Sequence, residues 1–428
     1  MAPTLALFAE RLSQEWTCAS VFSRVSLAMS KSGAVGQTRA MAPALDSQLP
    51  VEPVLDAWRM LVNAALTPAA TVSLQLRGNV YAAMLHVLGG IRKLGESSSS
   101  AGQKSRLVSG ALDILSDSAA LGDRLLESVS ADAADASDAW KTVAFSLLNA
   151  LASLFAVESR PNRVVMFLAR KNYFASFVGS MLRREDLAIQ ATLQPEPASL
   201  NALYIYEAKM SFFLQIAQRS DGAERLLENG IIDVLADCAF LDLRPQSGQG
   251  SHFADAFIPA RAERFHLLLM PALNLMLALV AKIGRDNLTL WMKAARFVSQ
   301  HHAVLEAVLK EVAVPANALS IAPLTQAKAV TTLVLFIARQ RAVLDREAAM
   351  AGSGHVGVAS MHLPILALLP KLSTSTNWAK RLMPANDVER TLMAVPASSV
   401  GGDLSDSSAA DVLRSLFGQQ ASEIVDSI

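Results

Sequence analysis

Apolar residues recur at helical spacing along most of the chain. Between Phe212 and Asp237 the sequence reads FFLQIAQRSDGAERLLENGIIDVLAD, with a polar break at 220–222 and a second break at Gly230. This pattern predicts a helix, turn, helix unit. Such a unit cannot bury its apolar face alone, so it predicts neighbours of the same kind.

The same spacing organises the rest of the chain, and alternating runs of β-branched residues typical of strands are missing. We therefore predict an all-α protein, an irregular armadillo/HEAT-like α-solenoid built as a superhelical stack of helix pairs and triplets. The expected parts are a partly disordered lead-in at 1–50, a helical segment at 51–130, an irregular helical-repeat solenoid at 138–351, Pro-interrupted helices at 352–395, and a disordered linker with an amphipathic tail helix at 396–428.

Three groups of three helices are expected inside the solenoid, separated by loops of unequal length. The predicted helices are 140–157, 162–169 and 173–182, then 200–218, 223–228 and 231–241, then 265–283, 288–299 and 303–312, followed by a long helix at 323–351. Polar loops are expected at 97–105 and 130–138, and larger insertions at 193–199 and 243–257.

Composition supports a large helical core. Of 428 residues, 52% are hydrophobic and 18% are charged, and the mean hydropathy is +0.32. The 38 basic residues balance the 38 acidic ones, which does not favour nucleic-acid binding. The most apolar window, 266–282, contains Pro271 and Asn274 and is shorter than the about 20 residues that cross a bilayer. We expect a buried helix there and no direct membrane span.

Residues with reactive chemistry are scattered. Cys18 and Cys238 lie far apart in apolar surroundings and are predicted to be buried thiols. His301 and His302 are adjacent, and neighbours on a helix point about 100° apart, which does not suit shared metal ligation. A packing or surface role is expected for both.

One glycine pattern, G-x-G-x-x-G at 352–357, matches a dinucleotide fingerprint by spacing. That fingerprint needs a strand before the loop, whereas a helix is predicted here. We therefore predict no enzyme, no catalytic residue, no cofactor, no metal and no small-molecule substrate.

Three stretches carry a family resemblance: SFFLQIAQRSDGAERLLENGIIDVLADCAFLDLRP at 211–245, RFHLLLMPALNLMLALVAKIG at 264–284 and WMKAARFVSQHHAVLEAVLK at 291–310. Over roughly 140–344 the chain resembles the C-terminal region of the largest inner-ring scaffold nucleoporins of the nuclear pore complex. The resemblance implies a structural scaffold at the nuclear envelope that binds linker nucleoporin helices and inner-ring scaffold subunits and supports nucleocytoplasmic transport and pore assembly. Phe417 and Gly418 form the only phenylalanine-glycine pair, which suits the scaffold and not the transport barrier.

A partner groove is hypothesised between adjacent helix pairs. Trp291, Phe297 and Val298 would line one side, and Leu333 and Phe336 the other, receiving an amphipathic peptide. The alternative is that these five residues are ordinary core.

Two other classes of protein remain open at this point. One is a generic armadillo or HEAT-type adaptor in the cytoplasm or nucleus. The other is a helical enzyme with its site in a helix-pair cleft, although the apolar helices around 147–155 and 267–283 supply no clustered carboxylates or histidines.

Overall fold

A computed structural model describes residues 51–93, 101–116, 119–156, 162–245, 258–284, 287–313, 321–340 and 361–368. Over these residues the regular structure is helical and no strand occurs, which confirms the all-α prediction. The chain divides into two compact units, Met1–Tyr173 and Phe174–Ile428, and each is described by itself. The lead-in at 1–50, the glycine pattern at 352–357 and the tail at 396–428 lie outside the described residues, and the predicted domain boundaries stay predictions.

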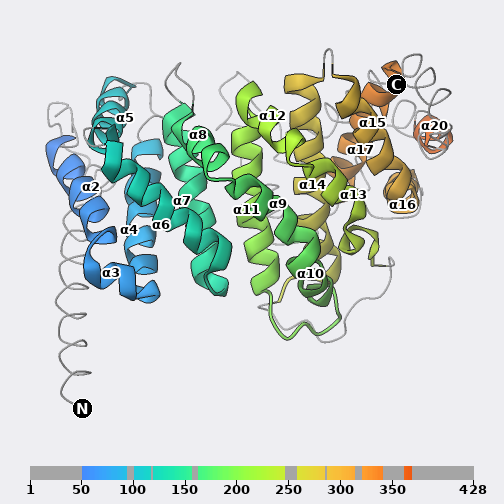
Figure 1. Ribbon diagram of the computed structural model, residues 1–428. Helices are drawn as coiled ribbons and strands as arrows, with labels where there is room; N and C mark the ends of the chain where they lie inside the picture. Colours follow the sequence, from blue (N-terminus) through green and yellow to red (C-terminus); the bar gives the residue numbers. More distant parts are fainter. Residues whose placement is uncertain are drawn as a thin grey trace, which may run out of the picture. The chain divides into compact units, whose positions relative to one another are not determined.

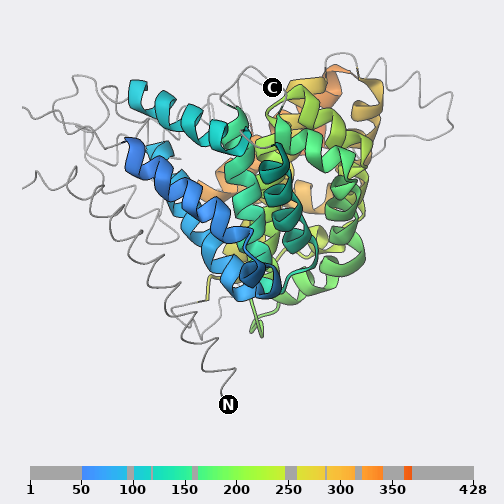
Figure 2. The same ribbon diagram turned by 60° about the vertical axis from the view of Figure 1, so that its left-hand side comes forward.

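Helices of unequal length make up the first unit. They are α2 (Val51–Ala65), α3 (Pro68–Val72), α4 (Leu74–Lys93), α5 (Ala101–Ser116), α6 (Ala119–Asp135), α7 (Asp138–Ala156) and α8 (Arg163–Arg170). α4 packs against α2 and α7, and α6 packs against α7 (Figures 1 and 2). Each helix therefore buries its apolar face against neighbours of the same kind, as the periodicity predicts.

The contact between α2 and α5 shows how one face is buried. Val54, Trp58, Leu61 and Val62 fall on one side of α2 and are all nearly inaccessible. The indole Nε1 of Trp58 donates to the carbonyl of Ala111 at 3.3 Å. Because the polar atom of this large side chain finds a partner, Trp58 can be fully buried without an unsatisfied donor.

Two predicted loops of this unit are partly wrong. α5 begins at Ala101, inside the expected loop at 97–105, and α6 continues to Asp135, inside the expected loop at 130–138. The sequence SADAAD at 130–135 looks polar, yet alanine is the best helix former. Asp132 is also tied to another helix, since it accepts two hydrogen bonds from Arg77 on α4.

The second unit begins within α9 (Tyr173–Ser180), whose first residue closes the first unit. It continues through the π-helical turn η2 (Met181–Glu185), α10 (Asp186–Thr192), α11 (Asn201–Ala217), α12 (Ser220–Glu228), α13 (Ile231–Asp237), the 3-10 turn η3 (Ala239–Asp242), α14 (Arg261–Ile283), α15 (Leu288–Gln300), α16 (His302–Ala313), α17 (Ile321–Arg339) and α20 (His362–Leu366). The long helix α14 packs against α11, α12 and α17 (Figure 1).

The turn between α12 and α13 is the one that the sequence predicts. Gly230 has φ of 75° and ψ of 27°, the left-handed conformation that glycine adopts without steric cost. Ile231 and Ile232 immediately after it are buried. This glycine therefore reverses the chain and lets both short helices bury their apolar faces.

Other predictions for this unit can be compared with the structure, and one of them is wrong. The helix expected at 173–182 does not end there, because η2 and α10 carry helical structure on to Thr192. The loop expected at 193–199 is confirmed. α17 covers the long helix expected at 323–351 as far as Arg339, and residues 341–351 lie outside the described residues. Cys238 is a buried free thiol, as predicted.

Two helices, α7 and α14, are long and apolar enough to cross a membrane by length and composition, with window hydropathies of 1.3 and 1.8. This is weak evidence, because a core helix of a soluble protein passes the same test. α14 carries the buried cation Arg264 and contains Pro271. The absence of a membrane span stays a prediction.

Candidate functional site

The hypothesised groove falls on two helices that pack against each other, α15 and α17. Within the chain, Phe297, Val298 and Leu333 are each 0% exposed, and Trp291 is 6% exposed. Phe336 is half-buried. The two sides of the hypothesised groove are thus brought together, and four of the five side chains are already covered by the chain itself.

Trp291 has a specific bonding role at the start of α15. Its indole Nε1 donates to the carbonyl of Gly284 at 2.6 Å, at the C-terminal end of α14. A Cβ at position 284 would approach within 3.0 Å of the Trp291 ring. Asn287 caps α15 by accepting from the amide of Leu290. The α14 to α15 corner is therefore held by side-chain to backbone bonds.

Phe297 packs against a buried histidine. The ring centroids of Phe297 and His301 are 5.0 Å apart, and the two rings meet edge to face at an interplanar angle of 64°. His301 is 2% exposed, and its Nδ1 lies 2.8 Å from an Asp242 carboxylate oxygen while its Nε2 lies 3.0 Å from the carbonyl of Leu235. His301 therefore has the packing role that the sequence indicated, and His302 beside it is exposed.

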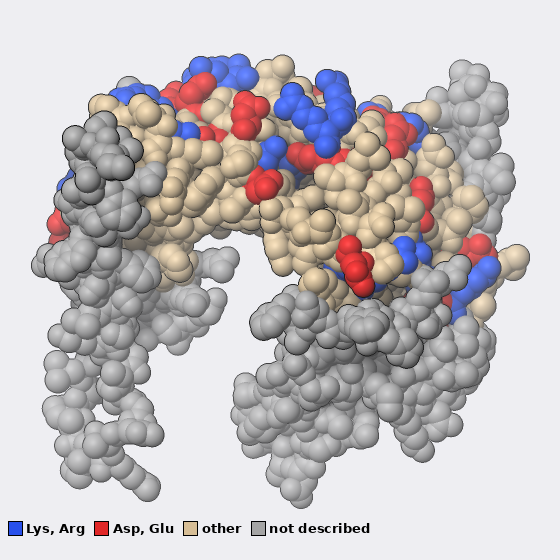
Figure 3. All heavy atoms as spheres, turned by 90° about the horizontal axis from the view of Figure 1, so that it is seen from below, with Lys and Arg blue, Asp and Glu red and all other residues tan. Residues whose placement is uncertain are grey.

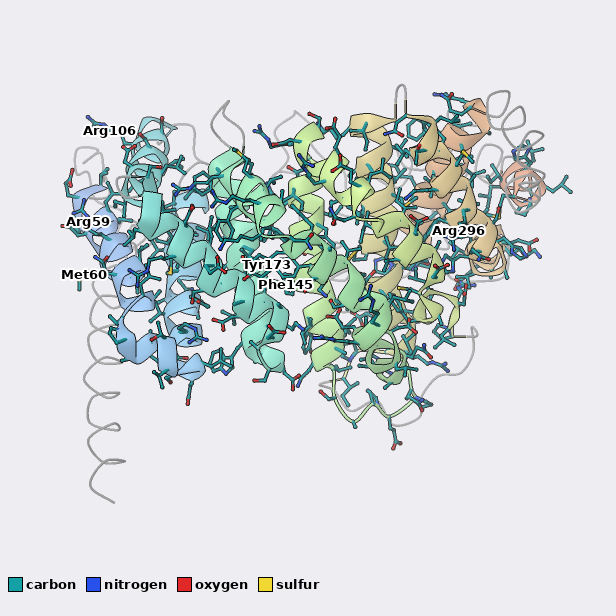
Figure 4. The ribbon with its side chains drawn as sticks, viewed as in Figure 1. Arg59, Met60, Arg106, Phe145, Tyr173 and Arg296 are labelled. Atoms are coloured by element: carbon teal, nitrogen blue, oxygen red, sulfur yellow. The ribbon has the colours of Figure 1, made fainter. Side chains whose placement is uncertain are left out.

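Ion pairs cover the outside of this region. On α15, Lys293 and Arg296 both bind Asp233 of α13, and Arg296 also binds Asp237. Arg296 is marked in Figure 4 beside α13. On the face of the molecule in Figure 3, basic and acidic side chains are interspersed, so charge there is mixed in sign. Exposed pairs of this kind contribute little to stability, typically below about 1 kcal/mol.

Phe336 on α17 is half-buried. The guanidinium carbon of Arg339, an exposed residue, sits 6.0 Å from the centre of its ring. A cation over an aromatic face at this distance is a weak attraction at an exposed position. Of the five groove residues, Phe336 is the one with side-chain surface left for a partner.

Several buried polar groups had no signal in the sequence. Lys209 is 0% exposed and bonds Glu185, and Arg264 is 2% exposed and bonds backbone carbonyls. In the first unit, Arg77 and Tyr81 both bond Asp132. Burial raises the pKa of Tyr81, with Asp132 adding to the rise. Each of these groups bonds a partner that lies far away in the sequence, so periodicity could not predict the bond.

In the part of the chain that the structure describes, no group of three or more His, Cys, Asp or Glu side chains could hold a metal ion. The expected absence of a metal stays a prediction. Burial raises the pKa of the Cys238 thiol far above its ordinary value, with neighbouring Asp186 and Asp237 adding to the shift. The reactive thiolate is therefore strongly disfavoured at Cys238.

Stacked amphipathic helices of uneven length, with side-chain bonds at the corners, define an α-helical scaffold of the solenoid class. A protein-family model described as "Nuclear pore complex scaffold, nucleoporins 186/192/205" matches residues 27–338, and the chain belongs to this family. The resemblance found in the sequence is confirmed at the level of the family. The family is described as a scaffold of the nuclear pore complex, so the expected location at the nuclear pore is confirmed at the same level.

Individual relatives agree with this membership. The chain is 30% identical over 193 residues to human "Nuclear pore complex protein Nup205", and 29% identical over 192 residues to the Drosophila melanogaster protein of that name. It is 25% identical over 211 residues to "Nucleoporin NUP192" of Chaetomium thermophilum. Each alignment covers 44% of this chain but only 9%, 9% and 12% of the relatives' own lengths.

A solved structure shows the same fold. It is "Nup188(aa1445-1827) from Myceliophthora thermophila", which aligns with a TM-score of 0.53 at 14% identity. The alignment covers 91% of this chain and 99% of that one. At this identity the likeness concerns the fold alone, and it confirms the α-solenoid prediction.

Proposed function

We propose that this chain is a structural part of the nuclear pore complex inner ring, where it holds other nucleoporins in place and so supports nucleocytoplasmic transport and pore assembly. The family match over residues 27–338 is the observation that carries the proposal. The solenoid fold supports it, because stacked helix pairs expose long surfaces to partners. A scaffold of this kind acts by binding and not by catalysis.

The partners we propose are other nucleoporins, namely inner-ring scaffold subunits and helical segments of linker nucleoporins. The seam between α15 and α17 is one candidate contact. Phe336 keeps part of its side chain exposed on α17, because it is half-buried. Phe297 and Leu333, both 0% exposed, could be reached only if the two helices separated.

An affinity purification from nuclear-envelope extract tests this function. The tagged chain is compared with Phe336→Asp and with Val72→Asp, a matched apolar-to-acid control at a position that is 89% exposed on α3. Mass spectrometry then identifies what stays bound at moderate salt. Each variant is also tagged with a fluorescent protein and located in cells, and circular dichroism verifies its fold.

Enrichment of inner-ring and linker nucleoporins together with fluorescence at the nuclear rim is the expected result. Loss of some of these partners with Phe336→Asp, but not with Val72→Asp, would support the α15 to α17 seam. Recovery of cytosolic cargo or signalling proteins without rim fluorescence would overturn the proposal in favour of a generic helical-repeat adaptor. Phe297→Asp is expected to unfold the second unit, because it places a charge in a fully buried position.

A further inference from the structure

A π-helical turn, η2, joins α9 to α10. It spans Met181–Glu185 and begins directly after Ser180, the last residue of α9. A π-turn accommodates one more residue than a turn of α-helix, and such turns occur frequently at functional sites. The extra residue changes the direction in which the side chains on either side of it point.

The π-turn directs Leu182 and Leu187 to the same side. In an uninterrupted α-helix, residues five apart point about 140° away from each other, because each residue turns the chain by about 100°. Across a π-turn, residues five apart take the relation that residues four apart have in an α-helix. Leu182 and Leu187 are 39% and 78% exposed, which places two large apolar side chains on one outer face.

The rest of α10 extends this face. Ala188 and Ala191 are exposed on the outer side of the helix, whereas Ile189 and Thr192 are buried on the inner side. Single exposed apolar residues are normal on protein surfaces, but gathered ones mark interaction sites. The outer side of η2 and α10 therefore carries the exposed apolar residues Leu182, Leu187, Ala188 and Ala191, with exposed arginines between the two leucines.

The exposed charge beside Leu182 and Leu187 is positive. Arg183 is exposed, and the two acidic residues that follow Arg184 bond partners inside the unit. Glu185 binds Lys209, and Asp186 accepts from the backbone amide of Phe240 and from the side-chain amide of Gln190. Charge complementarity therefore favours a partner with carboxylates next to its apolar residues.

Two buried cations anchor the two ends of this surface. At one end, Lys209 of α11 donates to the Phe177 carbonyl, to Ser180 Oγ and to Glu185. At the other end, Arg264 of α14 donates to the carbonyl of Thr192 at 2.5 Å, where α10 ends. Binding to a preformed surface costs less conformational entropy than binding to a mobile one.

We propose that Leu182, Leu187 and Arg183 form a docking surface for an amphipathic helical segment of another nucleoporin that carries carboxylates beside its apolar anchors. The identity of the partner as a nucleoporin rests on the proposed function. The apolar strip receives anchors at helical spacing, and the arginine selects for acidic flanks. This surface is on η2 and α10 and is separate from the α15 to α17 seam.

Site-specific photo-crosslinking in nuclear-envelope extract identifies the occupant. A photoreactive phenylalanine analogue replaces Leu187 in the full chain. The same analogue at Leu363 is the matched control, because that leucine is 76% exposed in the same unit, on α20. Crosslinked peptides are sequenced by mass spectrometry. The expected product at position 187, and not at 363, is a nucleoporin segment with acidic residues around helically spaced apolar ones.

The captured segment is then synthesised and its affinity is measured. Leu187→Ser is expected to weaken binding about tenfold or more, because one leucine anchor is lost, whereas Leu363→Ser leaves it unchanged. Arg183→Glu is expected to weaken binding as well, and a peptide with its flanking acids changed to lysine is expected to bind this variant better than the wild type.

Equal crosslinking at both positions would overturn the docking proposal. So would crosslinks at position 187 to a second copy of this chain, to lipid or to a segment without carboxylates. An unchanged affinity with Leu187→Ser would do the same. If nucleoporins are still retained and the chain still locates to the nuclear rim, only the docking surface is wrong. If the wild-type chain neither retains nucleoporins nor locates to the nuclear rim, the proposed function fails.

Discussion

Lys209 of α11 and Glu185 of the π-turn form a buried ion pair in which the lysine Nζ lies 2.7 Å from each carboxylate oxygen. The Lys209 side chain is 0% exposed and that of Glu185 is 14% exposed. A pair of this kind pays a large desolvation cost, so its net contribution to stability is small while both partners are present. Removing one partner has a larger effect, because the other charge stays buried without its opposite charge.

Glu185→Leu is expected to destabilise the second unit by about 3 to 5 kcal/mol, because it strands the Lys209 ammonium away from water. The double variant Glu185→Leu with Lys209→Met is expected to recover most of that loss. Urea unfolding measures both. Neutralising the exposed pair Arg225 and Glu228 serves as the control and should change stability by less than about 1 kcal/mol. Equal stability of the single and double variants would contradict the argument.

Arg264→Met is expected to loosen the chain after α10. The Arg264 guanidinium donates to the carbonyls of Thr192, Gln194 and Pro195, and burial lowers its pKa from the ordinary arginine value. Without it, amide hydrogen exchange over residues 193–200 should become faster. Arg264→Lys should fail to restore protection, because an ammonium cannot reproduce the planar fork of donors.

The control for this variant is Lys282→Met, at the exposed opposite end of the same helix, which should leave exchange over residues 193–200 unchanged. Unaltered exchange in Arg264→Met would show that the loop is held by other contacts.

His266 is expected to make stability depend on pH. It is half-buried on α14, and its Nδ1 lies 3.0 Å from Nε2 of the buried Gln326 on α17, which donates to it. Burial lowers the pKa of His266 below its ordinary 6.5. The unfolded chain therefore binds a proton at His266 more readily than the folded chain does. The contribution of neutral His266 to folding stability is present above pH 6.5 and is lost as pH falls through the lower folded pKa.

Denaturant unfolding at pH 7.5, 6.5 and 5.5 checks this prediction. The wild-type chain should lose stability toward pH 5.5 more steeply than His266→Gln, and the difference in slope is at most about 1.4 kcal/mol per pH unit. Parallel curves for the two proteins would show that His266 does not carry the dependence.

Replacing Gly78 or Gly89 on α4 by alanine should change the stability of the first unit in opposite directions. A Cβ at Gly78 would overlap the Trp140 ring of α7, whereas a Cβ at Gly89 would meet nothing within 4 Å. Gly89→Ala should stabilise the first unit by about 0.5 to 1 kcal/mol through helix propensity. Gly78→Ala should destabilise it by about 1 to 3 kcal/mol, as overpacking does. Thermal unfolding gives both signs, and a stabilising Gly78→Ala would rule out the close packing.

The candidate groove could be predicted only in part. Helical spacing indicated that residues around Phe297 and Leu333 belong to apolar helix faces, and the structure packs those faces against each other. Sequence spacing gives no measure of how closely two helices approach. For that reason it could not tell a partner groove from a closed seam, or show that Phe336 keeps exposed surface.

The sequence by itself determined the helical class, the α12 to α13 turn at Gly230 and the burial of Cys238, because these follow from periodicity and local backbone preference. Only the tertiary structure decided the π-turn, α10 and the buried bonds of Lys209 and Arg264. Lys209 meets a carboxylate 24 residues earlier in the chain, and Arg264 meets a carbonyl 72 residues earlier. Contacts at such separations depend on how helices pack, and the helical period of 3.6 residues carries no information about them.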